Sequence, residues 1–226
     1  MRILHLFSIF WLSISLSANS PVLNKDSITH PEVGLEGMVV TQHYLASEVG
    51  EAILNKGGNA YDATIAVAFA LAVVLPRAGN IGGGGFTVLY NSSDESFQSL
   101  DYREKAPLAA SKNMYLDKNG DVISNLSTLG YKAIAVPGTV DGMWELHKKY
   151  GSMDWKELIV PSIKLAKEGF KVSPLMADTL NRNYKSLSKF SETKKIFFQE
   201  NPVKFNSLLI QKDLAMTLEK ISNNGR

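Results

Sequence analysis

A run of glycines in the first half of the chain constrains the fold more than any other feature. Residues 79–86 read GNIGGGGF, and an apolar run follows at residues 87–90. Glycine has no side chain to pack and loses more backbone entropy on folding than other residues, so four in succession weaken any helix or strand. The run therefore predicts a tight turn at which the backbone passes close to another group or adopts a positive φ.

A phosphate-binding loop is the functional alternative for this run. The run lacks the Gly-Lys-Ser/Thr ending of a P-loop, and its glycines do not follow the spacing Gly-x-Gly-x-x-Gly. Taken alone, the run is better interpreted as a structural turn between a buried helix and a strand.

Helix and strand signals alternate around the run. Residues 60–75 are apolar on nearly every side, which predicts a buried helix that ends before Pro76. Residues 87–90 and 96–102 predict a hairpin, and Asp154 is placed to cap a later helix. The other expected elements are a strand at 37–41 and helices at 46–55, from the residue after Thr139 through Tyr150, at 155–168, from Pro174 onward and at 212–222. This order predicts a sheet with helices packed on it.

Charge and composition exclude several classes of function. The 226 residues include 24 basic and 22 acidic side chains, and the net charge of +2 is no electrostatic footprint for nucleic acid. The absence of cysteine excludes disulfides, thiolate metal sites and cysteine nucleophiles. The four histidines are scattered along the chain, so no metal site is indicated.

The first 20 residues have the pattern of a cleaved secretory signal peptide. A positively charged start precedes an apolar stretch at residues 3–16, and small residues follow it. The apolar stretch is too short to span a membrane comfortably. We therefore expect a signal peptide at residues 1–20, an exposed lead-in at 21–36 and a domain at 37–226. The expected location is periplasmic or secreted, with no membrane association after cleavage.

Arg103 is the strongest candidate for a binding residue. It follows the second predicted strand and lies near two acidic residues, Asp101 and Glu104. A guanidinium fork meets both oxygens of a carboxylate at once, so Arg103 could bind an anionic group. The alternative is an ordinary surface arginine that pairs with Asp101 or Glu104.

Two other polar residues have simpler structural interpretations. Asp62 lies inside the apolar helix and needs a partner if it is buried, which a hydrogen bond at the helix terminus would supply. Thr139 follows Pro-Gly and is expected to cap a helix, although the triplet could instead position a reactive threonine. No serine lies in a Gly-x-Ser-x-Gly elbow. The residues alone thus indicate an exported α/β domain without identifiable catalytic machinery.

Taken together, the motifs of the chain resemble the γ-glutamyltranspeptidase family. The resemblance extends over residues 37–225, which is nearly everything after the expected signal peptide. It rests on five motifs that come in the order and spacing of the family. They are GMVV at 37–40, GGNAYDA at 57–63, GNIGGGGF at 79–86, DYREKAP at 101–107 and VPGTV at 136–140.

The resemblance implies an N-terminal-nucleophile hydrolase. Such proteins are α+β and fold as a four-layer αββα sandwich, which would be incomplete in this chain. The precursor cleaves itself, and the new N-terminal threonine of the small subunit attacks the γ-glutamyl amide of glutathione. Water or an acceptor amino acid then takes the glutamyl group, and no metal or organic cofactor is implied.

The resemblance also assigns a role to Arg103. The family's arginine that binds the α-carboxylate of the glutamyl group matches this position. The implied partners are glutathione, other γ-glutamyl compounds and the small subunit of the same precursor.

The chain resembles only the first part of the family's large subunit. The nucleophilic threonine, the processing site and the small subunit have no counterpart in it, so we expect no catalytic residue here and no activity of the chain alone. The stop at Arg226, just after the last predicted helix, is expected to be an interruption. Missing layers would also expose apolar strands and leave their edges unpaired.

Three alternatives stand beside a γ-glutamyltransferase or glutathione hydrolase. A cephalosporin or glutaryl acylase on the same scaffold would also bind a carboxylate. A non-enzymatic remnant of a disrupted gene would share the family's ancestry without its activity. An exported carboxylate-binding module without chemistry would have to fold alone and bind glutamate.

Overall fold

The computed structural model describes residues 33–226, and Val39–Arg226 forms one compact unit. The signal peptide expected at residues 1–20 lies outside the described residues, as does most of the lead-in expected at 21–36. Within the described part of the chain, no helix is both long enough and apolar enough to cross a membrane.

Two successive helices, α1 (Tyr44–Asn55) and α2 (Ala60–Val74), pack against each other. The turn between them contains Gly57 with a φ of 90°, a left-handed conformation that glycine adopts without steric cost. Ile65 and Phe69 on α2 are fully buried. The apolar residues on all sides of α2 therefore match contacts on several sides, as the sequence predicts for residues 60–75.

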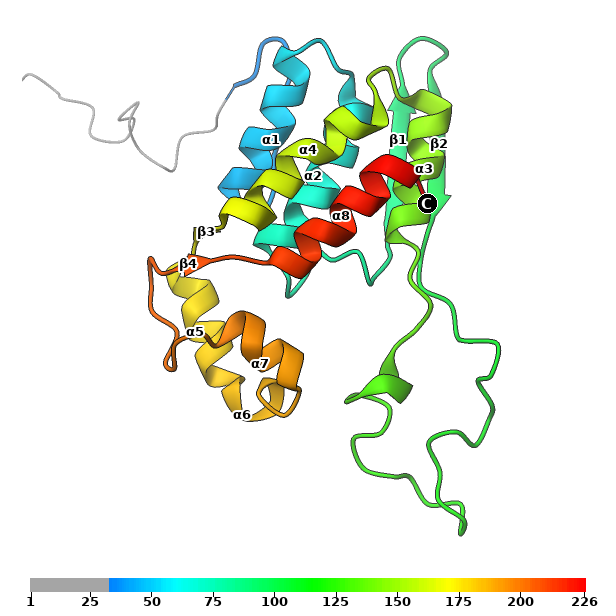
Figure 1. Ribbon diagram of the computed structural model, residues 1–226. Helices are drawn as coiled ribbons and strands as arrows, with labels where there is room; N and C mark the ends of the chain where they lie inside the picture. The colour runs from blue at the N-terminus through cyan, green and yellow to red at the C-terminus, as the bar shows by residue number, and fades with distance from the viewer. Residues whose placement is uncertain (1–32) are drawn as a thin grey trace, which may run out of the picture. The chain divides into compact units, whose positions relative to one another are not determined.

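The five longest helices form a continuous packed group around α2 (Figure 1). α2 contacts α1, α3 (Thr139–Tyr150) and α4 (Trp155–Glu168), and α8 (Lys212–Asn224) packs on α4. The ring of Trp155 meets Phe69 edge to face at a centroid distance of 5.6 Å, and its indole N–H donates to the carbonyl of Ile221 at 3.0 Å. Trp155 thereby joins α2, α4 and α8 in one core.

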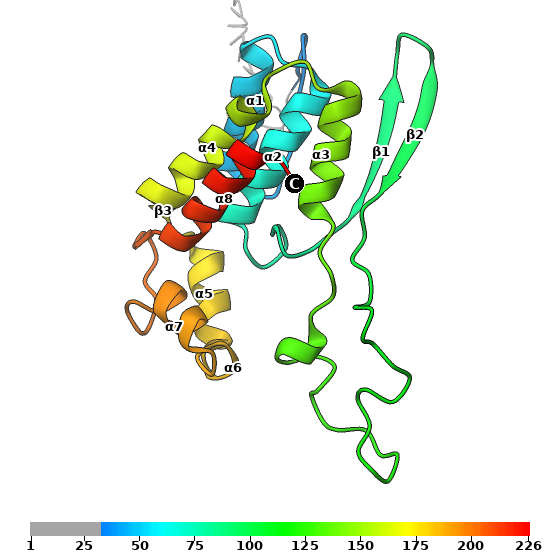
Figure 2. The ribbon, with the colours of Figure 1, turned by 45° about the vertical axis from the view of Figure 1, so that its right-hand side comes forward.

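A hairpin of β1 (Phe86–Asn91) and β2 (Ser96–Asp101) follows the glycine run. The strands are antiparallel, and Phe86 pairs with Asp101 at the open end. Side chains alternate across a strand, so Leu89 and Leu100 share one face, and both pack against the buried core. The hairpin lies beside α3 (Figure 2).

Shorter elements complete the fold. They are η1 (Tyr131–Ala133), the paired strands β3 (Phe170–Lys171) and β4 (Leu208–Leu209), and the helices α5 (Pro174–Arg182), α6 (Tyr184–Leu187) and α7 (Ser191–Phe197). α5 begins as predicted, because the hydroxyl of Ser173 accepts a hydrogen bond from the N–H of Met176 at 3.1 Å. The elements β3, β4, α6 and α7 are not predicted from the sequence, because each is too short for a periodic pattern.

The longer predicted helices are confirmed. α4 begins and ends at the predicted residues, because Asp154 accepts the N–H of Lys156 at 2.7 Å and Gly169 ends the helix with a φ of 85°. α1 begins at Tyr44 instead of Ala46, and α8 continues to Asn224 instead of Ser222.

The strand predicted at residues 37–41 is wrong. These residues have no regular secondary structure, because no strand in the described part of the chain pairs with them. The expected sheet is also smaller than predicted, since residues 33–226 contain only two separate two-stranded pairs. The α+β class is confirmed for this portion of the fold.

Candidate functional site

Arg103 lies directly after β2, where the chain leaves the hairpin. On one side, the N–H of Tyr102 donates to the carbonyl of Gly85 at 3.0 Å. On the other side, Lys105 and Val136 exchange two backbone hydrogen bonds of 3.2 and 2.8 Å. The backbone at Arg103 is therefore fixed on both sides, whereas its side chain is 67% exposed.

The guanidinium of Arg103 forms an ion pair with its neighbour in the chain. Its Nε lies 3.0 Å from Oε2 of Glu104, whereas the carboxylate of Asp101 accepts a hydrogen bond from the Arg103 N–H at 2.9 Å. The surface pair with Glu104 is thus confirmed. The terminal nitrogens Nη1 and Nη2 have no partner within residues 33–226, so the Glu104 pair leaves a fork that can bind both oxygens of a carboxylate.

Charged residues of both signs surround the hollow beside Arg103, which has a volume of about 240 Å³. Lys105 lines the hollow from the same segment as Arg103, and α3 contributes Asp141 and Glu145. Arg226 bonds Asp141 and lies 3.6 Å from Glu145. Because Arg226 pairs with Asp141 and the Nζ of Lys148 lies 2.8 Å from Glu145, both carboxylates have other cationic partners and Arg103 remains able to bind an added anion.

The glycine run anchors the start of α3. The carbonyl of Gly83 accepts hydrogen bonds from the N–H groups of Gly138 at 2.8 Å and Thr139 at 3.0 Å. A phosphate cradle would instead present N–H groups to its ligand. The structural interpretation of the run is therefore confirmed.

Thr139 does not cap α3, contrary to the prediction. Gly138 is the capping residue, and the Thr139 hydroxyl donates to the carbonyl of Asn80 at 3.1 Å. The cause is tertiary, because the glycine run returns to the helix start and offers a carbonyl that the sequence pattern does not reveal. The hydroxyl of Thr139 thus holds the run against α3.

Asp62 has a structural role, as predicted. It is fully buried, and its carboxylate accepts hydrogen bonds from the N–H of Asn59 at 3.0 Å and from the hydroxyl and N–H of Ser152. Burial raises the pKa of Asp62, but the hydrogen bonds together lower the pKa by more than burial raises it. The pKa therefore lies below its ordinary value. Ser152 lies 90 residues away in the sequence, and nothing in the local pattern identifies it as the partner.

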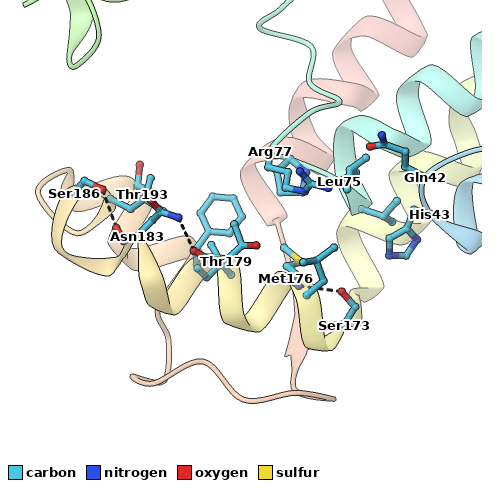
Figure 3. Close-up of a pocket in the computed structure, with 16 residues that line it drawn as sticks. Gln42, His43, Leu75, Arg77, Ser173, Met176, Thr179, Asn183, Ser186 and Thr193 are labelled. Carbon is cyan, nitrogen blue, oxygen red and sulfur yellow. Dashed lines mark hydrogen bonds between the residues drawn. The ribbon is translucent and has the colours of Figure 1, made fainter. Parts of the chain in front are cut away.

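A second candidate site is a cavity of about 330 Å³ between α5–α7 and the residues that follow α2 (Figure 3). Arg77 lines it, and His43 lies at one end. Burial lowers the pKa of His43, although the charge of Glu48 opposes the effect. The apolar lining includes Val74, Leu75, Leu175, Met176, Leu180 and Phe197.

This cavity is separate from the hollow beside Arg103. The two share no lining residue, and none of the residues proposed from the sequence as binding or reactive groups lies in the cavity. Its composition suits an apolar group next to one positive charge. The hollow at Arg103 is the better candidate for a carboxylate, because there a fixed backbone presents an open guanidinium fork.

One face of the hairpin exposes apolar side chains. Phe86, Val88 and Phe97 are 64%, 77% and 75% exposed. Tyr90 lies opposite Phe97 with its ring centroid 4.9 Å away, and these two rings share the face with Phe86 and Val88, so the four side chains form an apolar patch. Exposed apolar strands are expected from the sequence, and a patch of this kind favours association with other apolar surfaces.

Replacing Phe97 with threonine is expected to reduce aggregation of the purified chain. Threonine suits a strand and removes the most accessible aromatic ring of the patch. We expect lower binding of an apolar fluorescent dye and a larger soluble fraction, measured by dye titration and light scattering. Leu89→Thr, on the packed face of the same hairpin, should instead lower the melting temperature. Equal aggregation of the Phe97→Thr variant and the original chain would contradict a role for this face.

Comparison with known proteins places these features in a family. Residues 46–226 match the family model described as Gamma-glutamyltranspeptidase. The chain is 46% identical over 222 residues to the glutathione hydrolase proenzyme of Pseudomonas sp. strain A14, covering 97% of this chain and 38% of that protein. It is 41% identical over 204 residues to the proenzyme of Escherichia coli K12, covering 89% and 35%. The chain thus spans little more than a third of the length of these relatives, and it corresponds to their N-terminal portion.

Solved structures agree with this match. The crystal structure of Helicobacter pylori gamma-glutamyltranspeptidase superimposes with a TM-score of 0.83 at 47% sequence identity, covering 87% of this chain and 56% of that chain. A cephalosporin acylase from Bacillus halodurans superimposes with a TM-score of 0.72 at 23% identity, covering 90% and 40%. The second likeness concerns the fold alone.

Proposed function

Because the chain belongs to the gamma-glutamyltranspeptidase family, we propose that it forms the N-terminal part of the large subunit of a γ-glutamyltransferase or glutathione hydrolase. The observation that carries the proposal is the family match over residues 46–226. The open guanidinium of Arg103 supports it, because a γ-glutamyl donor carries a free α-carboxylate. The substrates would be glutathione and related γ-glutamyl compounds.

In this proposal Arg103 orients the donor. Its Nη1 and Nη2 donate two charge-assisted hydrogen bonds to the α-carboxylate, while Glu104 holds Nε. A carboxylate fixed at one end of the glutamyl group places the γ-amide carbonyl at a defined distance. Binding of this kind contributes mainly to the affinity for the donor, because the carboxylate is held in the same way before and during the attack.

The chemical step belongs to residues outside this chain. The N-terminal threonine of the small subunit would attack the γ-amide carbonyl through its hydroxyl oxygen, and its own α-amino group would accept the hydroxyl proton. The C–N bond then breaks, and the leaving amine takes the proton. Attack by water or by an amino acid on the resulting ester releases glutamate or a new γ-glutamyl compound.

The complete enzyme would have the four-layer αββα arrangement. The exposed face of β1 and β2 supports this proposal, because its aromatic residues need a covering layer. Both outer edges of the hairpin are also open within the described residues, so further strands can pair there.

Export is part of the proposal. The charged start, apolar stretch and small residues at positions 1–20 support a cleaved signal peptide and a periplasmic or secreted enzyme. Attachment of a reporter to the first 36 residues, followed by fractionation, would test this location.

Two alternatives have different consequences. A cephalosporin or glutaryl acylase would use the same scaffold, but the likeness to the acylase is at 23% identity and carries only the fold. A remnant without activity would retain the family's sequence and lack a partner. The coding DNA beyond the codon for Arg226 separates an enzyme segment from a remnant, since an enzyme segment requires the remaining large subunit and a threonine-led small subunit. Comparing turnover of γ-glutamyl and glutaryl substrates separates the transferase from the acylase.

The chain alone is expected to release no aniline from a γ-glutamyl anilide, because it lacks the nucleophile. Combined expression with the remaining part, taken from the downstream DNA or from the Pseudomonas relative, should restore release. The matched control carries alanine in place of the nucleophilic threonine of the added part. Turnover by the purified chain alone would refute the subunit proposal, and failure of every combination would favour the remnant.

A further inference from the structure

Glycines from the glycine run and from the start of α3 enclose Tyr102, the residue that immediately precedes Arg103. Two come from the glycine run, one from the turn before α3 and one from the first turn of α3. They are Gly84, Gly85, Gly138 and Gly142. The ring of Tyr102 is half-buried and packs against the core, so this residue is held from several directions.

The space around Tyr102 accepts no further side-chain atoms at three of these glycines. A Cβ atom on Gly84 or Gly138 would come within 3.0 Å of the Tyr102 carbonyl oxygen, and a Cβ atom on Gly142 would come within 3.0 Å of the tyrosine ring. Real Cβ atoms essentially never approach so closely. Any larger residue at these positions must therefore displace Tyr102 or the segment that opposes it.

The requirement for glycine at Gly84 comes from this close approach. A Cβ atom there would also lie 2.8 Å from the backbone nitrogen of Glu104, on the far side of Arg103. Gly82 belongs to the same run, yet its Cβ atom would meet only the side-chain oxygen of Asn80 at 3.4 Å. Gly84 thus contacts the segment that carries Arg103, whereas Gly82 does not.

We propose that Tyr102 is a positioning residue, which the surrounding glycines hold so that Arg103 presents its guanidinium to the substrate carboxylate at a fixed place. Bidentate binding depends on distance and direction, so a small shift of the backbone weakens both hydrogen bonds together. This inference rests on the proposed role of Arg103, and it gives the glycine run a function in substrate binding without contact to the substrate.

Hydrogen exchange in the 226-residue chain tests whether the glycines hold Tyr102 in place, and it requires no catalytic activity. Gly84→Ala is expected to accelerate exchange of the amide N–H groups of Tyr102 and Lys105 by about tenfold or more, because it forces the segment away from Gly85 and Val136. Gly82→Ala is the matched control and should leave these rates unchanged. Equal rates in the two variants would overturn the inference.

Two substitutions of Tyr102 test the same inference if the Gly84→Ala variant fails to fold. Tyr102→Phe keeps the ring and loses only the hydroxyl, whose contact with the hydroxyl of Thr87 is long at 3.4 Å. Tyr102→Ala removes the ring from its place beside Gly142. Exchange at Lys105 should rise in the alanine variant and stay unchanged in the phenylalanine variant, and no rise in the alanine variant would also overturn the inference.

Kinetics of the reassembled enzyme then test the consequence for substrate binding. Tyr102→Ala should raise KM for a γ-glutamyl anilide by about tenfold with little change in kcat. Tyr102→Phe should have the KM of the original enzyme. A 4-aminobutanoyl anilide, which lacks the α-carboxylate, should be turned over equally by the original and variant enzymes. On an Arg103→Ala background, Tyr102→Ala should have no further effect.

The outcomes separate the two ideas. If Arg103→Ala leaves KM for the γ-glutamyl donor unchanged, the proposed role of Arg103 fails. If Arg103→Ala raises KM but Tyr102→Ala does not, only the positioning role fails. If the enzyme cannot be reassembled, the exchange rates of the chain still decide whether the glycines hold the Arg103 segment.

Discussion

Arg103→Ala in the complete enzyme is expected to lower kcat/KM for γ-glutamyl donors by about two to three orders of magnitude. The change removes two charge-assisted hydrogen bonds to the α-carboxylate, each worth about 1.5–2 kcal/mol, and about 1.4 kcal/mol corresponds to a factor of ten. The loss should fall mainly on KM, because the carboxylate is bound equally in the ground state and the transition state. Initial rates over a range of donor concentrations measure both constants.

Two variants control for charge and for general damage to the hollow. Arg103→Lys keeps the positive charge but loses the planar fork, so its kcat/KM should fall between those of the original and alanine enzymes. Lys105→Ala removes a nearby positive charge that makes no fork at the hollow, and it should change kcat/KM by no more than about threefold. A similar loss for Lys105→Ala and Arg103→Ala would show that general charge, and not the fork, binds the donor.

Asp62→Asn is expected to lower the free energy of unfolding by about 3 kcal/mol, the largest stability effect that we expect from a single side chain. The amide has one acceptor oxygen in place of two and directs an N–H group at donors from Asn59 and Ser152. Because Asp62 is fully buried, water cannot replace the lost partners. Denaturant unfolding followed by circular dichroism measures the change. An unchanged midpoint would contradict the structural role of Asp62.

The pH dependence of stability provides a second test of Asp62. The pKa of Asp62 in the folded chain lies below its ordinary value of 3.8, so the carboxylate stabilises the fold above the unfolded pKa. That stabilisation is lost as the pH falls through the folded pKa. The original chain should therefore lose stability below about pH 4, and the part of this loss due to Asp62 should be missing in Asp62→Asn. In Ser152→Ala, the loss of stability at low pH should lie between the losses of the original chain and of Asp62→Asn.

Local sequence signals predict several elements of this fold well. The helix at α4 follows from Asp154 as its capping residue and Gly169 as its end, which are determined by neighbouring backbone groups. The buried helix α2 follows from apolar residues on all sides. The hairpin follows from two short strand patterns around a polar turn. Each of these signals lies within the element that it predicts.

The strand predicted at residues 37–41 shows where such signals fail. An extended apolar segment becomes a strand only when another strand supplies its hydrogen bonds, and no strand in the described part of the chain does so. The short elements β3, β4, α6 and α7 are present but not predicted, because their sequence signals are too weak. They contain too few residues to produce a pattern, and β3 and β4 form through their pairing with each other across the sequence.

The candidate site divides in the same way. The sequence alone identified Arg103 as a residue able to bind a carboxylate, because a guanidinium has this chemistry wherever it lies. The tertiary structure decided which carboxylate engages its Nε, which atoms remain free, and how Gly84, Gly138 and Gly142 close around Tyr102. It also brought Ser152 to Asp62 across 90 residues. Composition and local spacing determine which chemistry is present, but the distances that make it a site arise only when remote segments pack together.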